Sequence, residues 1–319
     1  MAGIVGGHDL LYDSTSVYID AGTGWTNPAY RNINITKDTS VSPAFYNWFM
    51  ANATKIPTGG VINLTPQSGV TYTTGLSNVS PDMISYISKC ISNNANVTNK
   101  TTTVYYDDKD NNHYKISIAD EVTISLNDTN YTFDIIGFNH DTLADANAYG
   151  SATATGKAGI TLMMKICYPV KYAMSSNTSG TGWNVTTMKT SVMSLVEKAL
   201  SSNWQTIIKN VNKNSGHIYG ITTDFISNVE RIFLLSESEI FGDYNALNSI
   251  SGEGEQYKYY DVVGSSARVR SDSDGVSSSY WTRSIARKKS SNYCCVTEDG
   301  NTTTAVYNTQ KAIVPAFCI

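Results

Sequence analysis

The sequence is poor in charged residues and in cysteine, and it contains no long apolar run. Lysine, arginine, aspartate and glutamate make up 16% of its 319 residues, against roughly 25% in an average soluble protein. The 23 basic and 27 acidic residues give a net charge of -4. We therefore expect no nucleic-acid partner, because such proteins usually carry a net basic surface. No run of about 18 apolar residues is present, so we also expect no insertion into a membrane.

Cysteine is scarce, and its spacing excludes the common cysteine-based sites. The five cysteines show no C-x-x-C spacing, and an odd number cannot form a complete set of disulfides within one chain. The N-terminus lacks a basic segment followed by an apolar run, which argues against a secretory signal. These features indicate free thiols in a protein made in a reducing cytoplasm. The cysteines are Cys90, Cys167, Cys294, Cys295 and Cys318.

Spacings typical of catalytic or metal sites are also absent. The four histidines are scattered, with neither His-x-Glu nor His-x-x-x-His spacing. His140, beside Asp141, follows a predicted buried strand and is better interpreted as a loop residue than as a base. Residues 272–275 (Asp-Ser-Asp-Gly) are similar to part of a calcium loop, but Arg270 and Trp281 stand where that loop needs carboxylates. We interpret this segment as a polar turn, and we expect no enzyme, no metal and no cofactor.

What the sequence does contain is enough apolar residues for a core and an unusual number of neutral polar and aromatic ones. Apolar residues make up 41% of the chain, which also has 21 tyrosines. Its length exceeds the usual size of one hydrophobic core. We predict an α+β protein in three parts: an N-terminal arm and helix for attachment or oligomerisation (1–57), a small α+β module (58–118), and a binding domain (119–319).

Several helices have recognisable start signals. Serine followed by proline at residues 42–43 and 80–81 places serine at the N-cap and proline at the first helical position. Ser236 and Glu239 form a capping-box pattern for a brief helix that ends at Gly242. Apolar residues at helical spacing predict two more helices, one from about Thr186 and one around Trp204.

Strands are predicted where short apolar or alternating runs lie between turn residues. Residues 298–301 (Glu-Asp-Gly-Asn) are interpreted as a hairpin turn between two further strands near the C-terminus. The predicted strands cover residues 18–20, 32–35, 60–64, 102–107, 113–118, 121–126, 131–138, 159–166 and 232–235.

The region after Ser265 has the pattern of a rigid scaffold with a polar surface, because short apolar runs alternate there with Ser, Asn, Tyr and Arg. Tyrosines stack on sugars or aromatic groups with little loss of entropy, and basic side chains attract carboxylates and anionic glycans. We predict a binding face here, although a merely solvated loop at residues 285–292 is an equal alternative. Its candidate ligand-binding residues are Tyr280, Arg287, Lys288, Asn292, Tyr293, Asn301, Tyr307 and Asn308.

Five segments occur in a fixed order: FDIIGFNHD (133–141), GKAGIT (156–161), LLSESEIFG (234–242), YWTRS (280–284) and PAFCI (315–319). Together they resemble an uncharacterised domain family common in clostridial surface proteins and their phages. The resemblance covers about residues 115–319. It implies a C-type-lectin-like fold, which that family shares with formylglycine-generating enzymes and phage tropism determinants.

The resemblance also implies roles for individual residues. Trp281 and Arg283 are expected in the scaffold, with Trp281 in the core and Arg283 in an internal ion pair, and Pro315 and Phe317 belong to the same scaffold. Family members commonly carry Trp-Trp-Leu-Arg-Ser where this chain has Tyr-Trp-Thr-Arg-Ser at 280–284. Phage proteins of this fold can be diversified by a retroelement at C-terminal positions rich in Asn, Tyr and Ser. The C-terminal loops of this chain resemble such a diversified region.

These expectations combine into one functional hypothesis, a phage virion protein assembled in the host cytoplasm. As a tail-tip or head-fibre adhesin, it docks on other virion proteins through its N-terminal arm and binds a host-surface glycan or protein through its C-terminal domain. We expect a homotrimer, since linked weak sites gain avidity.

Two alternatives come from other classes. One is a bacterial surface or structural protein of the same fold without a ligand. The other, less favoured, is an oxidase similar to formylglycine-generating enzymes, which hold copper with cysteines several residues apart. Cys294 and Cys295 are adjacent, so on a strand they point to opposite faces and do not converge on one ion.

Overall fold

The computed structural model describes residues 59–176, 182–216, 225–242, 248–249, 252–287 and 291–319, and the backbone of five short strands before residue 59. These strands form one sheet in the order β1-β2-β3-β4, with β5 parallel to β2. Two of them, β3 and β4, lie where strands were predicted. The helix predicted from residues 42–43 lies outside the described residues. The strands are β1 (Ile4–Val5), β2 (His8–Tyr12), β3 (Val17–Ile19), β4 (Asn32–Ile33) and β5 (Thr54–Lys55).

The chain divides into two compact units. The first contains Met1–Val61 with Asp107–Asn112, and the second contains Ile62–Tyr106 with His113–Ile319. The predicted boundary between a module at 58–118 and a domain at 119–319 therefore falls inside the second unit. The second unit combines helices with several sheets, so the predicted α+β class is confirmed.

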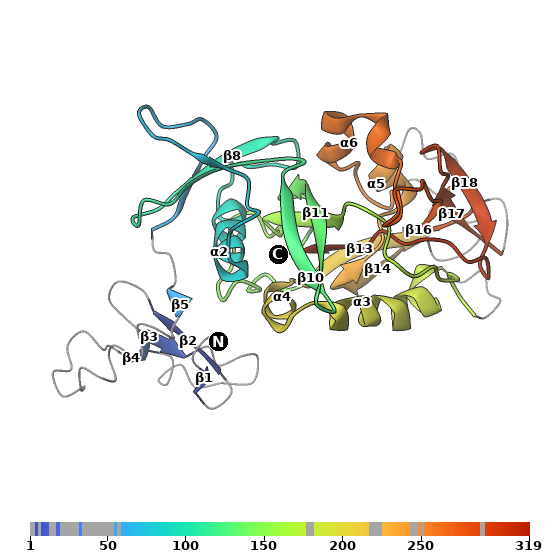
Figure 1. The fold of residues 1–319 in the computed structure, drawn as a ribbon, viewed down its shortest axis with the longest axis horizontal. Helices are drawn as coiled ribbons and strands as arrows, with labels where there is room; N and C mark the ends of the chain where they lie inside the picture. The colour runs from blue at the N-terminus through green and yellow to red at the C-terminus, as the bar shows by residue number, and fades with distance from the viewer. Residues whose placement is uncertain are drawn as a thin grey trace. The chain divides into compact units, whose positions relative to one another are not determined.

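A five-stranded sheet at the centre of the second unit has the order β10-β11-β12-β19-β15. All four of its pairings are antiparallel. Every residue of β12 is buried, as expected of a continuous apolar strand covered on both faces. The C-terminal strand β19 lies between β12 and β15, and Ile319 is fully buried, so the end of the chain is part of the core. Figure 1 marks the C-terminus between α2 and β10 in that view. The strands are β10 (Glu121–Leu126), β11 (Thr129–Phe138), β12 (Ile160–Met164), β15 (Ile232–Phe233) and β19 (Ala316–Cys318).

Helix α2 (Pro81–Ser92) joins the predicted small module to this core. Its cap forms as the sequence indicates, since the Ser80 side chain accepts a hydrogen bond from the Met83 amide at 3.3 Å. Ser88, on the buried face of α2, donates to the C-terminal carbonyl of Ile319 and accepts from the amide of Ile160 at 3.0 Å. The two predicted parts therefore share one interior.

Three smaller sheets surround the centre, in the orders β6-β8-β9-β7, β13-β14 and β16-β17-β18. The hairpin predicted at 298–301 joins β17 to β18. The strands are β6 (Val61–Asn63), β7 (Thr73–Thr74), β8 (Thr103–Asp107), β9 (His113–Ser117), β13 (Val211–Gly216), β14 (Phe225–Glu230), β16 (Tyr280–Ile285), β17 (Asn292–Val296) and β18 (Thr302–Val306).

The helix predicted from about Thr186 begins with a π-helical turn at Met188–Val192 and continues as α3 (Met193–Ala199). α4 (Ser202–Ile207) and α5 (Glu237–Phe241) also lie where helices were predicted. α6 (Lys258–Val263) was missed, because tyrosines supply its buried face and leave no apolar periodicity.

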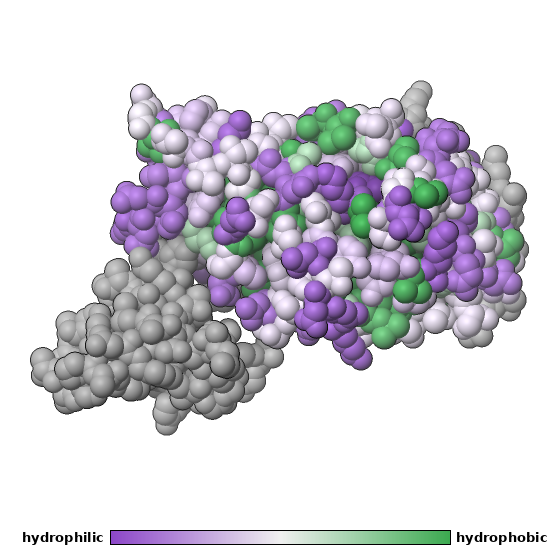
Figure 2. All heavy atoms as spheres, in the orientation of Figure 1, coloured by the Kyte–Doolittle hydropathy of each residue, from purple (hydrophilic) through white to green (hydrophobic). Residues whose placement is uncertain are grey.

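The visible face of the described residues is mostly hydrophilic or intermediate, with hydrophobic side chains in small separate patches (Figure 2). Large apolar side chains such as Trp183, Phe133 and Phe317 are fully buried instead. The low charge content of the sequence is therefore compatible with a polar surface.

The contact between α2 and the β12 segment gives a stability prediction. A Cβ at Gly159 would lie 1.9 Å from the Ser88 carbonyl oxygen, so Gly159→Ala must displace backbone. We expect a loss of more than about 3 kcal/mol in the free energy of unfolding, measured by urea denaturation. Gly150→Ala is the control, because its φ is positive (+78°) but its Cβ meets open space, and it should cost about 1–2 kcal/mol. Equal losses in the two variants would contradict this packing.

Candidate functional site

Two of the predicted ligand-binding residues are inside the protein. Tyr280 is 3% exposed and Tyr293 is 2% exposed. The Tyr280 hydroxyl donates to the Arg268 carbonyl at 2.9 Å, and the Tyr293 hydroxyl donates to the Gly182 carbonyl at 3.3 Å. The expectation that they point outward is wrong, because β16 and most of β17 are covered on both faces.

The other predicted contacts lie in less covered places. Asn301 and Asn308 are exposed, whereas Arg287, Asn292 and Tyr307 are half-buried. Asn292 donates to the Thr304 hydroxyl across the β17–β18 pair at 3.2 Å, and Tyr307 packs against the core. Lys288 lies outside the described residues. The predicted binding face is thus reduced to a few residues along the edge of the β16-β17-β18 sheet.

The predicted scaffold residues are all buried. The Trp281 indole donates to the Tyr172 carbonyl at 2.9 Å. Phe317 packs near Phe133, with ring centroids 5.4 Å apart, and Pro315 lies just before it. Arg283 is completely buried and pairs with Glu239.

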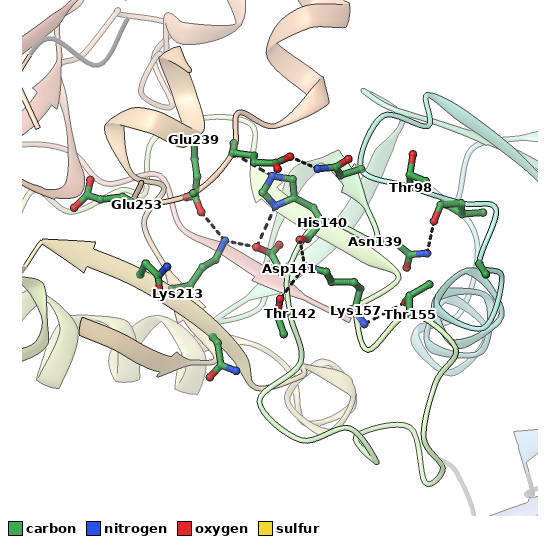
Figure 3. A pocket seen from close by; sticks show the side chains of 17 residues that line it. Thr98, Asn139, His140, Asp141, Thr142, Thr155, Lys157, Lys213, Glu239 and Glu253 are labelled. Carbon is green, nitrogen blue, oxygen red and sulfur yellow. Dashed lines mark hydrogen bonds and ion pairs between the residues drawn. The ribbon is translucent and has the colours of Figure 1, made fainter. Parts of the chain in front are cut away.

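A cavity of about 550 Å³ opens in the second unit where β11 ends, beside β13 and α5 (Figure 3). We call it the β11 pocket. Sequence reasoning did not predict it as a site, although two of its walls come from the segments at 133–141 and 234–242. Its lining residues are Ala95, Val97, Thr98, Asn99, Asn139, His140, Asp141, Thr142, Thr155, Lys157, Asn212, Lys213, Asn214, Glu239, Glu253, Gly254 and Glu255.

The floor of the pocket is a chain of buried charges. Lys213 pairs with Asp141 and, at 2.9 Å, with Glu239. Glu239 in turn pairs with both terminal nitrogens of Arg283. Figure 3 shows Lys213 reaching between the two carboxylates. The alternating order of charges lets each group neutralise its neighbours, which a buried charge requires.

Both carboxylates of this chain are also hydrogen-bonded elsewhere. Asp141 accepts from Thr161 at 2.7 Å and from Tyr257 at 2.8 Å. Burial disfavours its charged form, but the Lys213 ammonium and the His140 ring outweigh burial and hold its pKa well below the usual range. For Glu239, Arg283 and Lys213 likewise outweigh burial and lower the pKa. Lys213 itself has a raised pKa, since the two carboxylates outweigh its own desolvation.

Glu253 behaves differently. It is 1% exposed, and its carboxyl accepts from the Gly216 amide at 2.8 Å and from the Ser284 hydroxyl. Burial raises its pKa to about 7, and the nearby Arg283 offsets only part of that effect. Glu253 therefore changes charge near neutral pH.

His140 connects the floor to the loop at residues 252–256. Its Nδ1 lies 3.2 Å from Asp141, and its Nε2 lies 3.1 Å from the Glu255 carbonyl. The ring stacks on Tyr257 with centroids 3.8 Å apart. These contacts favour a positioning role for His140, in line with its interpretation as a loop residue.

Asn139 has an unusual environment at the end of β11. Its φ is +43°, and it is 5% exposed. Its side-chain amide donates to the carbonyls of Ile91 and Val97, each at 3.0 Å, which ties the end of α2 to the pocket wall. Its Oδ1 accepts no hydrogen bond from any residue that the structure describes.

Four of the five thiols, those of Cys167, Cys294, Cys295 and Cys318, lie in environments that disfavour their reactive form, because burial raises their pKa. The five cysteines all lie among the described residues, and none of them forms a disulfide bond. Burial raises the pKa of Cys294 well above its ordinary value and that of Cys295 to about 11. Metal ligation and nucleophilic attack need the thiolate, so these positions give no support to the oxidase alternative.

Three structural observations bear on metals and membranes. Within the described ranges, no three His, Cys, Asp or Glu side chains converge as a metal site would require. Asp272 accepts from the amides of Asp274 and Val276, each at 3.0 Å, which accounts for the polar turn. Each helix that the structure describes is too short or too polar to cross a lipid bilayer.

Comparison with known proteins is informative for the C-terminal half. Residues 161–319 match a family described as "Domain of unknown function (DUF6273)". The match includes Lys213, Glu239, Glu253 and Arg283, but it begins after the Asn139 wall of the pocket. No curated protein and no solved structure matches this chain.

The buried charge chain predicts a large mutational effect. Lys213→Met leaves Asp141 and Glu239 buried beside an apolar side chain, so we expect a loss of about 3–5 kcal/mol in unfolding free energy. Lys165→Met is the matched control, since Lys165 pairs with Glu121 at the surface with about half of each side chain exposed, and it should cost less than about 1 kcal/mol. Chemical denaturation of both variants measures the difference. Similar losses in unfolding free energy would show that the buried ion pairs of Lys213 contribute no more than a surface pair.

Glu253 predicts a pH dependence. Because its folded pKa is raised from 4.5 to about 7, its contribution to stability is fully present below about pH 4.5 and is lost as the pH rises through 7. Glu253→Gln removes this loss. The stability of the variant relative to wild type should therefore increase from pH 5 to pH 8, by about 3 kcal/mol at most, in urea denaturation at several pH values. Glu255→Gln controls for loss of a nearby carboxylate, and parallel profiles for wild type and Glu253→Gln would rule the assignment out.

Proposed function

We propose that this protein is a recognition component of a phage particle, a tail-tip or head-fibre adhesin that binds a host-surface glycan or protein. In this proposal residues 119–319 adopt the C-type-lectin-like fold that the sequence resemblance implies. The N-terminal arm attaches the protein to other virion proteins. A homotrimer would multiply a weak single site through avidity.

The observation that supports binding is the state of the charged groups in the β11 pocket. Lys213 pairs with both Asp141 and Glu239, and each of the three residues is at most 4% exposed. The groups that reach solvent around them are mainly hydroxyls and amides, such as Thr98 and Asn214. A rigid, internally neutralised floor with a polar rim is suited to holding a ligand by hydrogen bonds.

The site differs from the one expected from sequence alone. The predicted C-terminal face retains exposed Asn301 and Asn308, but it has lost Tyr280 and Tyr293 to the core. We therefore assign recognition to the β11 pocket first, with the edge of β18 as an additional contact. A structural protein without a ligand is the rival proposal.

Binding to cells tests the proposed function. Fluorescently labelled full-length protein should bind cells of the bacterial strain that carries the gene, and antibodies against it should detect it in purified phage particles. The control is an unrelated protein of similar size and net charge. Absence of both cell binding and particle incorporation would reject the proposal, whereas incorporation without binding would favour the structural rival.

A further inference from the structure

We infer that Lys213 and Asp141 form an isopeptide bond by their own chemistry, in which Lys213 Nζ joins the side-chain carboxyl carbon of Asp141 and one water molecule is released. The bond ties the segment after β11 covalently to β13. This inference concerns a modification of the protein interior and does not depend on the proposed adhesin function.

An amine, a carboxyl group and a base meet at one buried point. Lys213 Nζ contacts Asp141 Oδ1 and lies 2.9 Å from Glu239 Oε1. The three side chains are each 2–3% exposed, and the Phe233 ring centroid lies 4.1 Å from Nζ. Bulk water is therefore largely excluded from the site. Groups held in contact in this way can reach effective concentrations of about 10⁵–10⁸ M, which favours condensation.

Asp141 is the better acceptor of the two carboxyl groups. Its Oδ2 accepts hydrogen bonds from the hydroxyls of Thr161 at 2.7 Å and Tyr257 at 2.8 Å. These donors stabilise the negative charge that develops on Oδ2 when an amine adds to the carbon. Both oxygens of Glu239 are instead bound by Arg283, which is always charged and keeps Glu239 ionised. Glu239 is therefore suited to accept a proton from the amine.

The pair reaches its reactive form without a proton from solvent. Burial opposes both charges, but neighbouring opposite charges outweigh it, so the pKa of Asp141 is lowered and that of Lys213 is raised. The resting state is therefore an ion pair. Transfer of one proton from Nζ to Oδ1 gives a neutral amine and a neutral carboxyl group at unchanged net charge, and burial favours this neutral form.

The atoms and charges of the reaction balance without a co-reactant. The Nζ lone pair adds to the side-chain carbon of Asp141, and Glu239 takes the proton that the nitrogen loses. The bond from this carbon to Oδ1 then breaks with its electron pair on the oxygen, and the Oδ1 hydroxyl leaves as water with the proton that Glu239 returns. One hydrogen stays on the amide nitrogen, and Glu239 is ionised again. All three residues line the β11 pocket, which provides an exit for the water.

Intact-mass spectrometry of the denatured full-length protein tests the bond. The wild-type chain should be lighter than its amino-acid sequence by the mass of one water molecule, because a covalent bond survives unfolding. Proteolytic digestion and tandem mass spectrometry should then give one branched peptide that joins the segment containing Asp141 to the segment containing Lys213. A wild-type mass equal to that of the sequence, or a loss of water without this branched peptide, would overturn the inference.

Variants test the roles of the individual residues. Lys213→Arg keeps a positive charge but has no amine to form the amide, so its mass should equal that of its sequence. Glu239→Gln removes the base and should slow bond formation by about 10²-fold or more, measured as the branched fraction over time after purification. Unchanged formation in Glu239→Gln would refute the role of Glu239, and the wild-type mass decides the inference even where a variant does not fold.

The same digest contains a matched control. Lys165 and Glu121 also form an ion pair, with about half of each side chain exposed. Because water solvates both groups and no buried base adjoins them among their printed contacts, they should appear only in linear peptides. A branched peptide at this surface pair would contradict the requirement for a buried, preorganised site.

Discussion

Four charged side chains, Asp141, Lys213, Glu239 and Arg283, form a continuous buried chain in the second unit. They come from the segment after β11, from β13, from α5 and from β16, so the chain of ion pairs connects four separate parts of the fold. Burying any one of these groups alone would be unfavourable, and their alternation in charge makes the arrangement stable only as a set. The geometry of the β11 pocket depends on this set, because three of its members line the pocket.

The same constraint bears on the recognition function that we propose for the pocket. Groups that would be reactive if free are committed to internal contacts, and Arg283 also donates to the carbonyls of Leu234, Asn214 and Glu253. Glu253 is the exception, as its pKa near 7 makes its charge sensitive to ordinary changes in pH. His140 contacts Asp141 in the floor through one ring nitrogen and the Glu255 carbonyl in the loop at 252–256 through the other. The pocket is thus fixed at its base by ion pairs, and its rim carries amides and hydroxyls together with Lys157 and Glu255.

Local patterns predicted the elements well. The caps of α2 and α5 form as their sequences indicate, and the capping box of α5 is present in both directions between Ser236 and Glu239. However, the same Glu239 carboxylate also binds Lys213 and Arg283, which lie 26 and 44 residues away. A capping-box pattern carries no information about such distant partners. The pattern of the C-terminal region likewise could not show that Tyr280 and Tyr293 lie in covered strands.

The amino-acid sequence by itself determined the α+β class, the positions of most helices and strands, and the apolar scaffold around Trp281 and Phe317, because these depend on periodicity, capping and burial of apolar surface. Only the tertiary structure decided which polar side chains face a cavity. Hydrogen bonds from Asn139 to the Val97 carbonyl, from Asn99 to Glu255 and between His140 and the Glu255 carbonyl join the pocket segments at 95–99, 139–142 and 253–255. Such a site depends on contacts between residues far apart in the chain, and short-range patterns do not encode them.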